Sequence, residues 1–343
     1  MPQSASIAAA PAEPPTTAET PELNATTYDV FNGDADGLCA LHQLRLAEPC
    51  TGTLITGVKR DIALLRQVPL QPGIQVNVFD ISLDSNSDAL QALLASGASV
   101  RYFDHHSAAR LQPHPGLESH IDQAPDVCTS LLVDRHLQGR YRHWAIAAAF
   151  GDNLNAVATR LASAAGLSAG QTGQLRQLGE LLNYNAYGEQ VSDLCYPPEQ
   201  LYRAIQPYVS PFDFIAAAPQ FATLAACHAD DNARLGQLQP LVQQPHAAVY
   251  RLPAEKWARR ISGILANRLT ETDPHKAYAI LSSSADASLV VSVRAPKDSR
   301  HSAAGLCSQY PGGGGRVAAG GINHLPASEV DAFIGRFFAY FAD

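Results

Sequence analysis

Four short motifs rich in aspartate, each placed directly after an apolar run, constrain this chain more than any other feature. They are Asn32-Gly33-Asp34-Ala35-Asp36-Gly37, Asp80, Asp104-His105-His106 and Gly151-Asp152-Asn153. The preceding runs read as buried strands, although the last of them, residues 144–150, also fits an alanine-rich helix. Parallel strands of an open α/β sheet align their carboxyl ends along one edge, where ligands bind. We therefore expect the four motifs to meet at one site.

Carboxylates that are crowded together repel one another unless a positive charge lies between them. A pair of divalent metal ions supplies that charge. Each motif is weak when taken alone, because aspartate also caps helices and forms turns. Two adjacent histidines beside a carboxylate strengthen the third motif, since imidazole is a common metal ligand. Together the four motifs predict a metal centre.

The order of elements predicts an α/β fold whose first domain is a doubly wound parallel sheet. Predicted strands alternate with helices at residues 28–31, 37–44, 53–58, 76–80, 85–94, 100–103 and 128–137. Residues 107–125 read as a loop, and residues 154–240 read as helical. Strands at 247–252, 277–281 and 289–294, with helices at 261–269 and 330–341, predict a smaller α/β domain at the end. The expected division is a disordered tail (1–26), a catalytic metal-binding domain (27–190), a helical linker (191–245) and a glycine-rich substrate-binding domain (246–343).

Charge and cysteine usage narrow the class of protein. The net charge of −8 argues against sequence-independent binding of long nucleic acid. Residues 241–343 carry eleven Lys and Arg against eight Asp and Glu, so the negative charge belongs to the front half. This division fits a metal-binding domain beside an anion-binding one, with chance fluctuation as the alternative. Six scattered cysteines without a C-x-x-C pair predict buried thiols in a reducing cytoplasm rather than a zinc site or disulfides.

No apolar run reaches the ~18 residues that span a membrane, and the start of the sequence shows no secretory pattern. We therefore expect a cytoplasmic protein with no membrane partner. Lys59 and Arg60 are expected in a solvated loop. The segment 183–188 either lines a cleft between the domains or packs structurally.

The last domain contains a glycine run, Gly312 to Gly315, followed by Arg316 and Ala318-Ala319-Gly320. Glycines let backbone N–H groups approach an anion closely, so the run predicts an anion-binding concavity, with a flexible loop as the alternative. Arg294 ends a predicted strand, and its position alone indicates a surface arginine.

These motifs resemble those of the DHH phosphoesterase superfamily, which takes its name from the third motif. The glycine run with Arg316 and Ala318-Ala319-Gly320 resembles the signature of that family's associated C-terminal domain. Members with this domain cleave oligonucleotides, single-stranded DNA or cyclic dinucleotides. The resemblance covers roughly residues 27–325.

The resemblance implies two Mn²⁺ ions per chain, with Mg²⁺ as the second choice, at the carboxyl ends of the first sheet. The implied ligands are Asp34, Asp36, Asp80, His105 and Asp152. Asp80 would bridge the ions, Asp104 would orient a histidine, and His106 would face the phosphate. Substrate phosphate would be held by Arg294, Gly313, Gly314, Gly315 and Arg316.

Two departures from the family pattern concern ligand residues. Asn32 stands where many relatives carry a histidine, and its carboxamide is a weak, neutral ligand. Arg316 stands where the glycine signature usually ends in histidine; arginine still binds phosphate, in a bidentate way and at any physiological pH.

The function we predict is metal-dependent hydrolysis of short oligonucleotides or dinucleotides to 5′-mononucleotides. The alternatives are a non-catalytic nucleotide-binding protein with a degraded metal site, or an enzyme for cyclic dinucleotides or 3′-phosphoadenosine 5′-phosphate. The expected partner is the nucleotide substrate, and a homodimer is left open.

Overall fold

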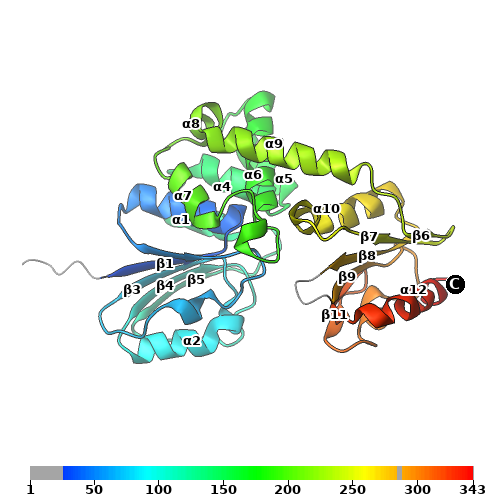
Figure 1. The fold of residues 1–343 in the computed structure, drawn as a ribbon. Coiled ribbons are helices and arrows are strands. Elements are labelled where there is room, and N and C mark those ends of the chain that lie inside the picture. Colours follow the sequence, from blue (N-terminus) through cyan, green and yellow to red (C-terminus); the bar gives the residue numbers. More distant parts are fainter. Residues whose placement is uncertain (1–25, 284–287, 343) are drawn as a thin grey trace, which may run out of the picture.

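The computed structural model describes residues 26–283 and 288–342, so the expected tail at 1–26 lies almost wholly outside the described residues (Figure 1). Its first sheet has five parallel strands in the order β2-β1-β3-β4-β5. The strands are β1 (Thr27–Phe31), β2 (Thr53–Thr56), β3 (Gln75–Phe79), β4 (Ser99–Asp104) and β5 (Leu117–Ile121). The predicted parallel α/β sheet is confirmed. Strand β5 lies where we expected only a loop.

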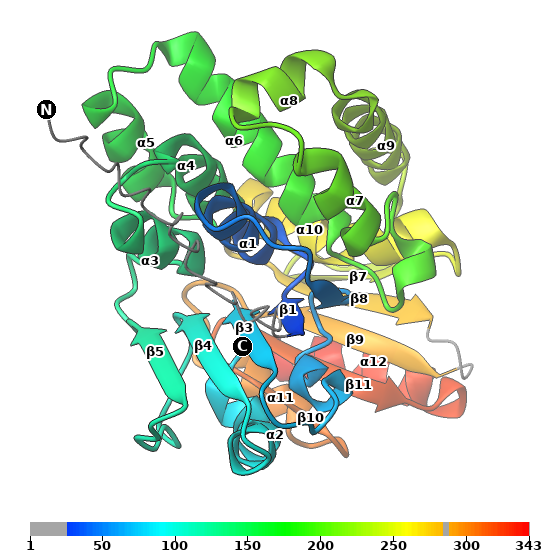
Figure 2. The same cartoon turned by 90° about the vertical axis from the view of Figure 1, so that its left-hand side faces the viewer.

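Helices cover both faces of this sheet, as the doubly wound prediction requires (Figures 1 and 2). Helices α1 (Ala35–Ala47), α3 (Thr129–His136) and α4 (Arg142–Gly151) lie on one face, and α2 (Leu83–Ala95) with the short helix η1 (Leu64–Gln67) lies on the other. Neighbouring strand residues point to opposite faces. Phe31 and Phe79 therefore enter the core under α1, while Val30 and Val78 enter the core under α2.

Helix α4 settles the open choice at residues 144–150 in favour of a helix. Asp152 therefore follows a helix and not a fourth strand, which corrects the simplest picture of four strand ends. The alanine-rich sequence lets α4 approach its neighbours closely. A Cβ atom at Gly151 would lie 2.5 Å from Cβ of Ala35 and 2.7 Å from the Gly179 carbonyl oxygen.

The middle of the chain is helical, as predicted. It contains α5 (Asn155–Ala164), α6 (Ala169–Asn185), η2 (Val191–Asp193), α7 (Pro198–Ile205), α8 (Pro211–Ala217) and α9 (Pro219–Leu235). Prolines occupy the first turns of α7, α8 and α9, where a missing N–H costs no hydrogen bond.

The second sheet is mixed and has the order β10-β11-β9-β8-β7-β6. Its strands are β6 (Val242–Gln243), β7 (Ala247–Arg251), β8 (Ala277–Ser283), β9 (Leu289–Arg294), β10 (Gly313–Gly315) and β11 (Ala319–Leu325). Helices α10 (Lys256–Thr272), α11 (Ala303–Cys307) and α12 (Val330–Tyr340), with the short helix η3 (Ala327–Glu329), complete the domain. The glycine run therefore forms an edge strand paired with β11, so the alternative of a flexible loop there is wrong, while anion binding by the run stays a prediction.

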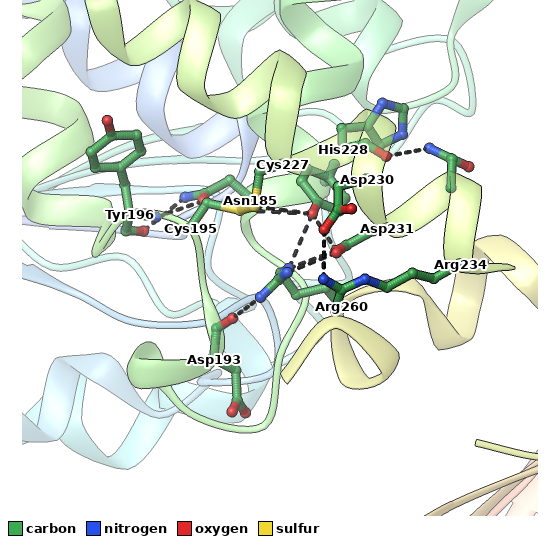
Figure 3. Close-up of a disulfide and its surroundings, with 12 residues drawn as sticks. Asn185, Asp193, Cys195, Tyr196, Cys227, His228, Asp230, Asp231, Arg234 and Arg260 are labelled. Atoms are coloured by element: carbon green, nitrogen blue, oxygen red, sulfur yellow. Dashed lines mark hydrogen bonds and ion pairs between the residues drawn. A yellow bond between two sulfur atoms is a disulfide. The ribbon is translucent and has the colours of Figure 1, made fainter. Parts of the chain in front are cut away.

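A buried ion pair joins the second domain to the helical segment (Figure 3). Arg260 of α10 donates from Nε and Nη2 to the two carboxylate oxygens of Asp231 in α9, at 2.8 and 2.9 Å. Its Nη1 donates to the Asp193 carbonyl oxygen at 2.6 Å. The hydroxyl of Tyr184 also contacts Asp231 and Arg260. Residues of α6, η2, α9 and α10 are thus fixed around one guanidinium group.

A disulfide joins Cys195 to Cys227 beside this ion pair (Figure 3), so the expectation of thiols alone is wrong for these two residues. Their spacing carries no signal, because the pairing arises only when α9 packs back along the segment after η2. Cys39, Cys128 and Cys307 are buried free thiols, as expected, whereas Cys50 is exposed. None of the described helices is long and apolar enough to cross a membrane.

Candidate metal centre

The first two motifs lie at the point where the strand order reverses. Strand β1 pairs with β2 on one side and with β3 on the other, and ligands of open α/β sheets bind outside the carboxyl ends of strands at such a point. A pocket of about 260 Å³ opens there. Its lining includes Asn32, Asp34, Lys59, Asp80, His105, His106 and Asp152. Residues from all four motifs therefore share one pocket.

The first motif is held by helix ends. Asp34 caps α1, and its Oδ1 accepts the backbone N–H groups of Asp36 and Gly37 at 3.1 Å each. Asp36 is buried and accepts the N–H groups of Thr129 and Ser130, the first residues of α3, at 2.7 Å each. The positive end of a helix stabilises a carboxylate. Two helix N-termini thus fix the two aspartates of this motif.

Asp80 is the most unfavourably placed carboxylate of the pocket. It has a left-handed backbone, with φ of 57°, which is strained for a residue other than glycine. Burial, followed by the charges of Asp34 and Asp36, raises the pKa of Asp80 well above its ordinary value. Strain and charge repulsion at a pocket wall are typical of a functional site, where a cation would relieve the repulsion.

His105 presents one ring nitrogen to the pocket. Its Nδ1–H donates to the Val127 carbonyl oxygen at 3.0 Å, so the lone pair lies on Nε2. Nε2 is 3.4 Å from Asp80 Oδ1 and 4.0 Å from Asp152 Oδ2. A backbone carbonyl that orients the imidazole in this way is a common feature of metal sites.

Two groups of metal-ligating atoms share His105. One group is Asp80, His105 and His106; the other is Asp36, His105 and Asp152, and within each group the ligand atoms lie within 4.8 Å of one another. The two groups contain four of the five predicted ligands, Asp36, Asp80, His105 and Asp152, together with His106, which was predicted to face the phosphate. Asp34 lies in the same pocket, but its Oδ2 forms an ion pair with the Lys59 ammonium group.

Asp104 is fully buried and organises the third motif. Its Oδ1 accepts the N–H groups of His105 and His106 at 2.9 and 3.2 Å, and Nδ1–H of His106 at 2.7 Å. This hydrogen bond is the main reason that the pKa of His106 is raised. The structure therefore pairs Asp104 with the ring of His106, while the ring of His105 is oriented by a backbone carbonyl.

Lys59 was missed by the sequence reasoning, because a lysine in a loop after a strand reads as solvated. Its Nζ lies 2.5 Å from Asp34 Oδ2 and 3.1 Å from Asn183 Oδ1. Burial would raise the pKa of Asp34, but the Lys59 ammonium group outweighs this and the pKa is lowered. A cation thus already sits against Asp34. Arg60 is exposed, as expected.

The chemistry of the donors fits divalent metal ions. Oδ1 of Asn32 is buried, and no hydrogen-bond partner for it exists among the described residues. Such an orphaned oxygen costs free energy unless a ligand or ion satisfies it. Burial, followed by the charges of Asp36 and Asp34, raises the pKa of Asp152 to about 7. Hard oxygen ligands with one or two imidazoles suit Mn²⁺ or Mg²⁺.

The second domain places only part of the predicted substrate site together. Arg294 ends β9 opposite Ala319 of β11 and lines a pocket of about 460 Å³. Burial lowers its pKa, and no carboxylate forms an ion pair with it within the described part of the chain. Arg316 is exposed on the turn between β10 and β11 and does not line this pocket; Gly313, Gly314 and Gly315 lie in the edge strand β10.

Comparisons with known proteins show which solved structures share this architecture. No protein-family model matches the sequence, and no curated protein sequence does either. Among solved structures, the RecJ–Mn²⁺ complex from Thermus thermophilus has a TM-score of 0.62 at 18% identity. That match covers 92% of this chain, and the chain spans about half (52%) of that RecJ.

Two further structures match over nearly their full length. A second exonuclease RecJ bound to manganese has a TM-score of 0.61 at 16% identity, over 92% of this chain and 90% of that one. The pGpG-specific phosphodiesterase PggH from Vibrio cholerae has a TM-score of 0.56 at 16% identity, over 92% and 99%. At these identities the likeness concerns the fold. The five-stranded parallel sheet, the helical middle and the mixed second sheet show that this chain shares the fold of these RecJ and PggH structures.

Proposed function

We propose that this chain is a metal-dependent phosphodiesterase that hydrolyses linear dinucleotides and other short oligonucleotides to 5′-mononucleotides. The observation that carries the proposal is the pair of ligand groups sharing His105, Asp36–His105–Asp152 and Asp80–His105–His106, at the strand-order reversal of the sheet. His105 has one free lone pair, on Nε2, and can serve one ion, while the carboxylates of Asp36, Asp80 and Asp152 around it supply oxygen atoms for a pair of ions.

Asp36, Asp80, His105 and Asp152 would hold two Mn²⁺ ions, with the free carbonyl oxygen of Asn32 as an additional neutral ligand. When bound, such a pair of ions lowers the pKa of the attacking water and neutralises charge on the phosphate. Asp80, whose carboxylate interacts with the charges of Asp34, Asp36 and Asp104, would bridge the ions. Asp34 would bind a metal ion only if that ion displaced the Lys59 ammonium group from its carboxylate.

His106 would act on the phosphate itself. Asp104 holds its Nδ1–H and raises its pKa, so a protonated ring is favoured, with Nε2 free for an oxygen of the substrate. A positioned imidazolium can donate a hydrogen bond to a phosphate oxygen or a proton to the leaving oxygen. His106 is more exposed than His105, which agrees with a role toward substrate and not in packing.

The second domain would hold the far end of the substrate. Its pocket of about 460 Å³ is in the range of small-molecule sites, and Arg294 offers it a guanidinium group without a carboxylate partner among the described residues. In Figure 1 the parallel strands of the first sheet point toward this domain. Arg316, exposed at the neighbouring turn, would give a second phosphate contact.

Short substrates are favoured over long strands on two grounds. The second domain has a small surplus of positive charge, too little to follow a long strand. The match to PggH covers 99% of the PggH chain, and PggH is a pGpG-specific phosphodiesterase. The competing function is a non-catalytic nucleotide-binding protein, favoured by the lysine that sits against Asp34.

The test is a panel of substrates incubated with purified protein and Mn²⁺ or Mg²⁺, with EDTA as the blank. It contains labelled di- to decanucleotides, cyclic dinucleotides, 3′-phosphoadenosine 5′-phosphate and pyrophosphate. We expect 5′-mononucleotides from the shortest linear substrates. Tight binding of a dinucleotide without turnover, and with one metal ion or none per chain, would instead support the binding protein.

A further inference from the structure

A third group of metal-ligating side chains lies outside the candidate metal centre in the described part of the chain. Glu118 and His120 belong to the edge strand β5, and His136 is the last residue of α3. One ligand atom from each lies within 4.8 Å of the others. None of the three lines the pocket at the strand-order reversal.

The backbone brings these side chains together for simple reasons. Residues 118 and 120 are two apart on a strand and therefore point to the same face of the sheet. On that face β5 lies beside the last turn of α3, because the rings of His120 and His136 contact each other with centroids 4.9 Å apart. Nε2 of His120 is 2.7 Å from Oε1 of Glu118.

One buried ring orients both imidazoles. Phe103 of β4 stacks on His120, with centroids 4.4 Å apart and planes at 5°, and meets His136 edge to face at 5.4 Å. Packing against a fixed neighbour removes the rotamer freedom that a metal would otherwise have to take from the ligands. Three surface side chains without such support would be a weaker candidate.

The charges around the group favour a cation. Arg101 lies 3.8 Å from Glu118, but its guanidinium group is also held by Glu48 at 3.0 Å, so two carboxylates face one positive charge. Burial, followed by the nearby His120 and Arg101, lowers the pKa of His136. Metal binds to the neutral form of an imidazole.

We propose that Glu118, His120 and His136 form a separate binding site for Zn²⁺ or a similar transition-metal ion. Two imidazoles and one carboxylate are a known zinc ligand set, with the fourth position left to water. All three side chains are at least partly exposed, so an ion can enter from solvent. The site lies outside the two-metal centre and does not depend on the proposed catalytic function.

The bound ion would fasten the edge strand β5 to helix α3. The other end of α3 supplies the N–H groups of Thr129 and Ser130 that hold Asp36 of the candidate metal centre. An ion bound by His136 at one end of this helix therefore helps to fix the carboxylate at the other. Covering or tying down an edge strand also protects it from pairing with other chains.

The experiment is a zinc count by elemental mass spectrometry after dialysis against Zn²⁺, for wild type, His136→Ala and the control His275→Ala. His275 is a surface histidine paired with Asp298 at 2.8 Å, and it belongs to no such group within the described residues. Zn²⁺ also competes with Mn²⁺ at the candidate metal centre, so the informative quantity is the difference between variants. We expect His136→Ala to bind one zinc ion fewer per chain than wild type and the control.

A second variant guards against a folding defect. Glu118→Gln removes the charge of an exposed ligand, and we expect it to weaken zinc binding by about tenfold or more. Zinc should also raise the melting temperature of wild type and His275→Ala by more than that of His136→Ala. Equal zinc counts and affinities in wild type and both site variants, or a zinc ion lost from His275→Ala as well, would overturn the proposal.

Discussion

Replacing Lys59 with methionine should destabilise the metal-free protein and, through the same interaction, strengthen its binding of Mn²⁺. Among the described residues that line the pocket of the candidate metal centre, Lys59 is the only lysine or arginine. Its ammonium group lies 2.5 Å from Oδ2 of Asp34. Methionine keeps an unbranched chain of similar length but has no charge, so the carboxylates would face one another without compensation.

The magnitude follows from the geometry. A hydrogen bond to a charged group contributes roughly 1.5–3 kcal/mol. The Lys59 side chain is 32% exposed, and solvent screening lowers the expected loss to about 1–2 kcal/mol. The melting temperature should then fall by roughly 2–8 °C. If a metal ion must displace Lys59 from Asp34, Mn²⁺ binding to wild type costs this same free energy and binding to Lys59→Met does not. The Kd for Mn²⁺ should therefore be about five- to thirtyfold lower in the variant.

Thermal unfolding in EDTA and calorimetric titration with Mn²⁺ measure the two effects. Arg60→Met is the matched control, because Arg60 is the exposed neighbour of Lys59 in the same loop. It should change neither quantity. If Lys59→Met melts like wild type in EDTA, or binds Mn²⁺ more weakly than wild type, Lys59 does not compete with metal for Asp34 and the reasoning fails.

Three more predictions concern other parts of the chain. The pKa of Asp152 is raised to about 7, so between about pH 4 and 7 the folded protein holds a proton there that the unfolded chain has released. The free energy of unfolding, measured with urea in EDTA, should therefore fall as pH rises over this range. Asp152→Asn should flatten this slope. Arg294→Ala should raise KM about tenfold to a hundredfold with metal content intact, whereas the exposed Arg251→Ala should not. The bridge between Cys195 and Cys227, 32 residues apart, should contribute roughly 3–4 kcal/mol of unfolding free energy, which Cys195→Ser or a reductant removes.

The candidate metal centre could be located from sequence because its signals are local. An apolar run followed by aspartate marks the end of a buried strand, and parallel strands bring such ends to one edge whatever the loops do. This reasoning needs no knowledge of which strands are neighbours. It is enough to predict that Asp80 and His105 lie beside Asp34 and Asp36, and the structure places these side chains together.

The remaining features depend on contacts between distant segments. Lys59 reaches Asp34 only because β2 lies beside β1, and Cys195 meets Cys227 only because α9 folds back along the chain. Strand β5 is short, half-exposed and polar, so its sequence carries no alternating apolar pattern. The glycine run carries no strand signal, since glycine has no side chain to pack and its pairing is set by β11.

The central claim is that the four motifs form a two-metal centre that cleaves phosphodiesters. Its most direct test is the Mn²⁺-dependent release of 5′-mononucleotide from pGpG by wild type and by Asp80→Asn, with circular dichroism to confirm that both are folded. The account predicts rapid release by wild type, none in EDTA, and loss of both activity and bound metal in Asp80→Asn. Release that persists in EDTA or in Asp80→Asn would contradict it.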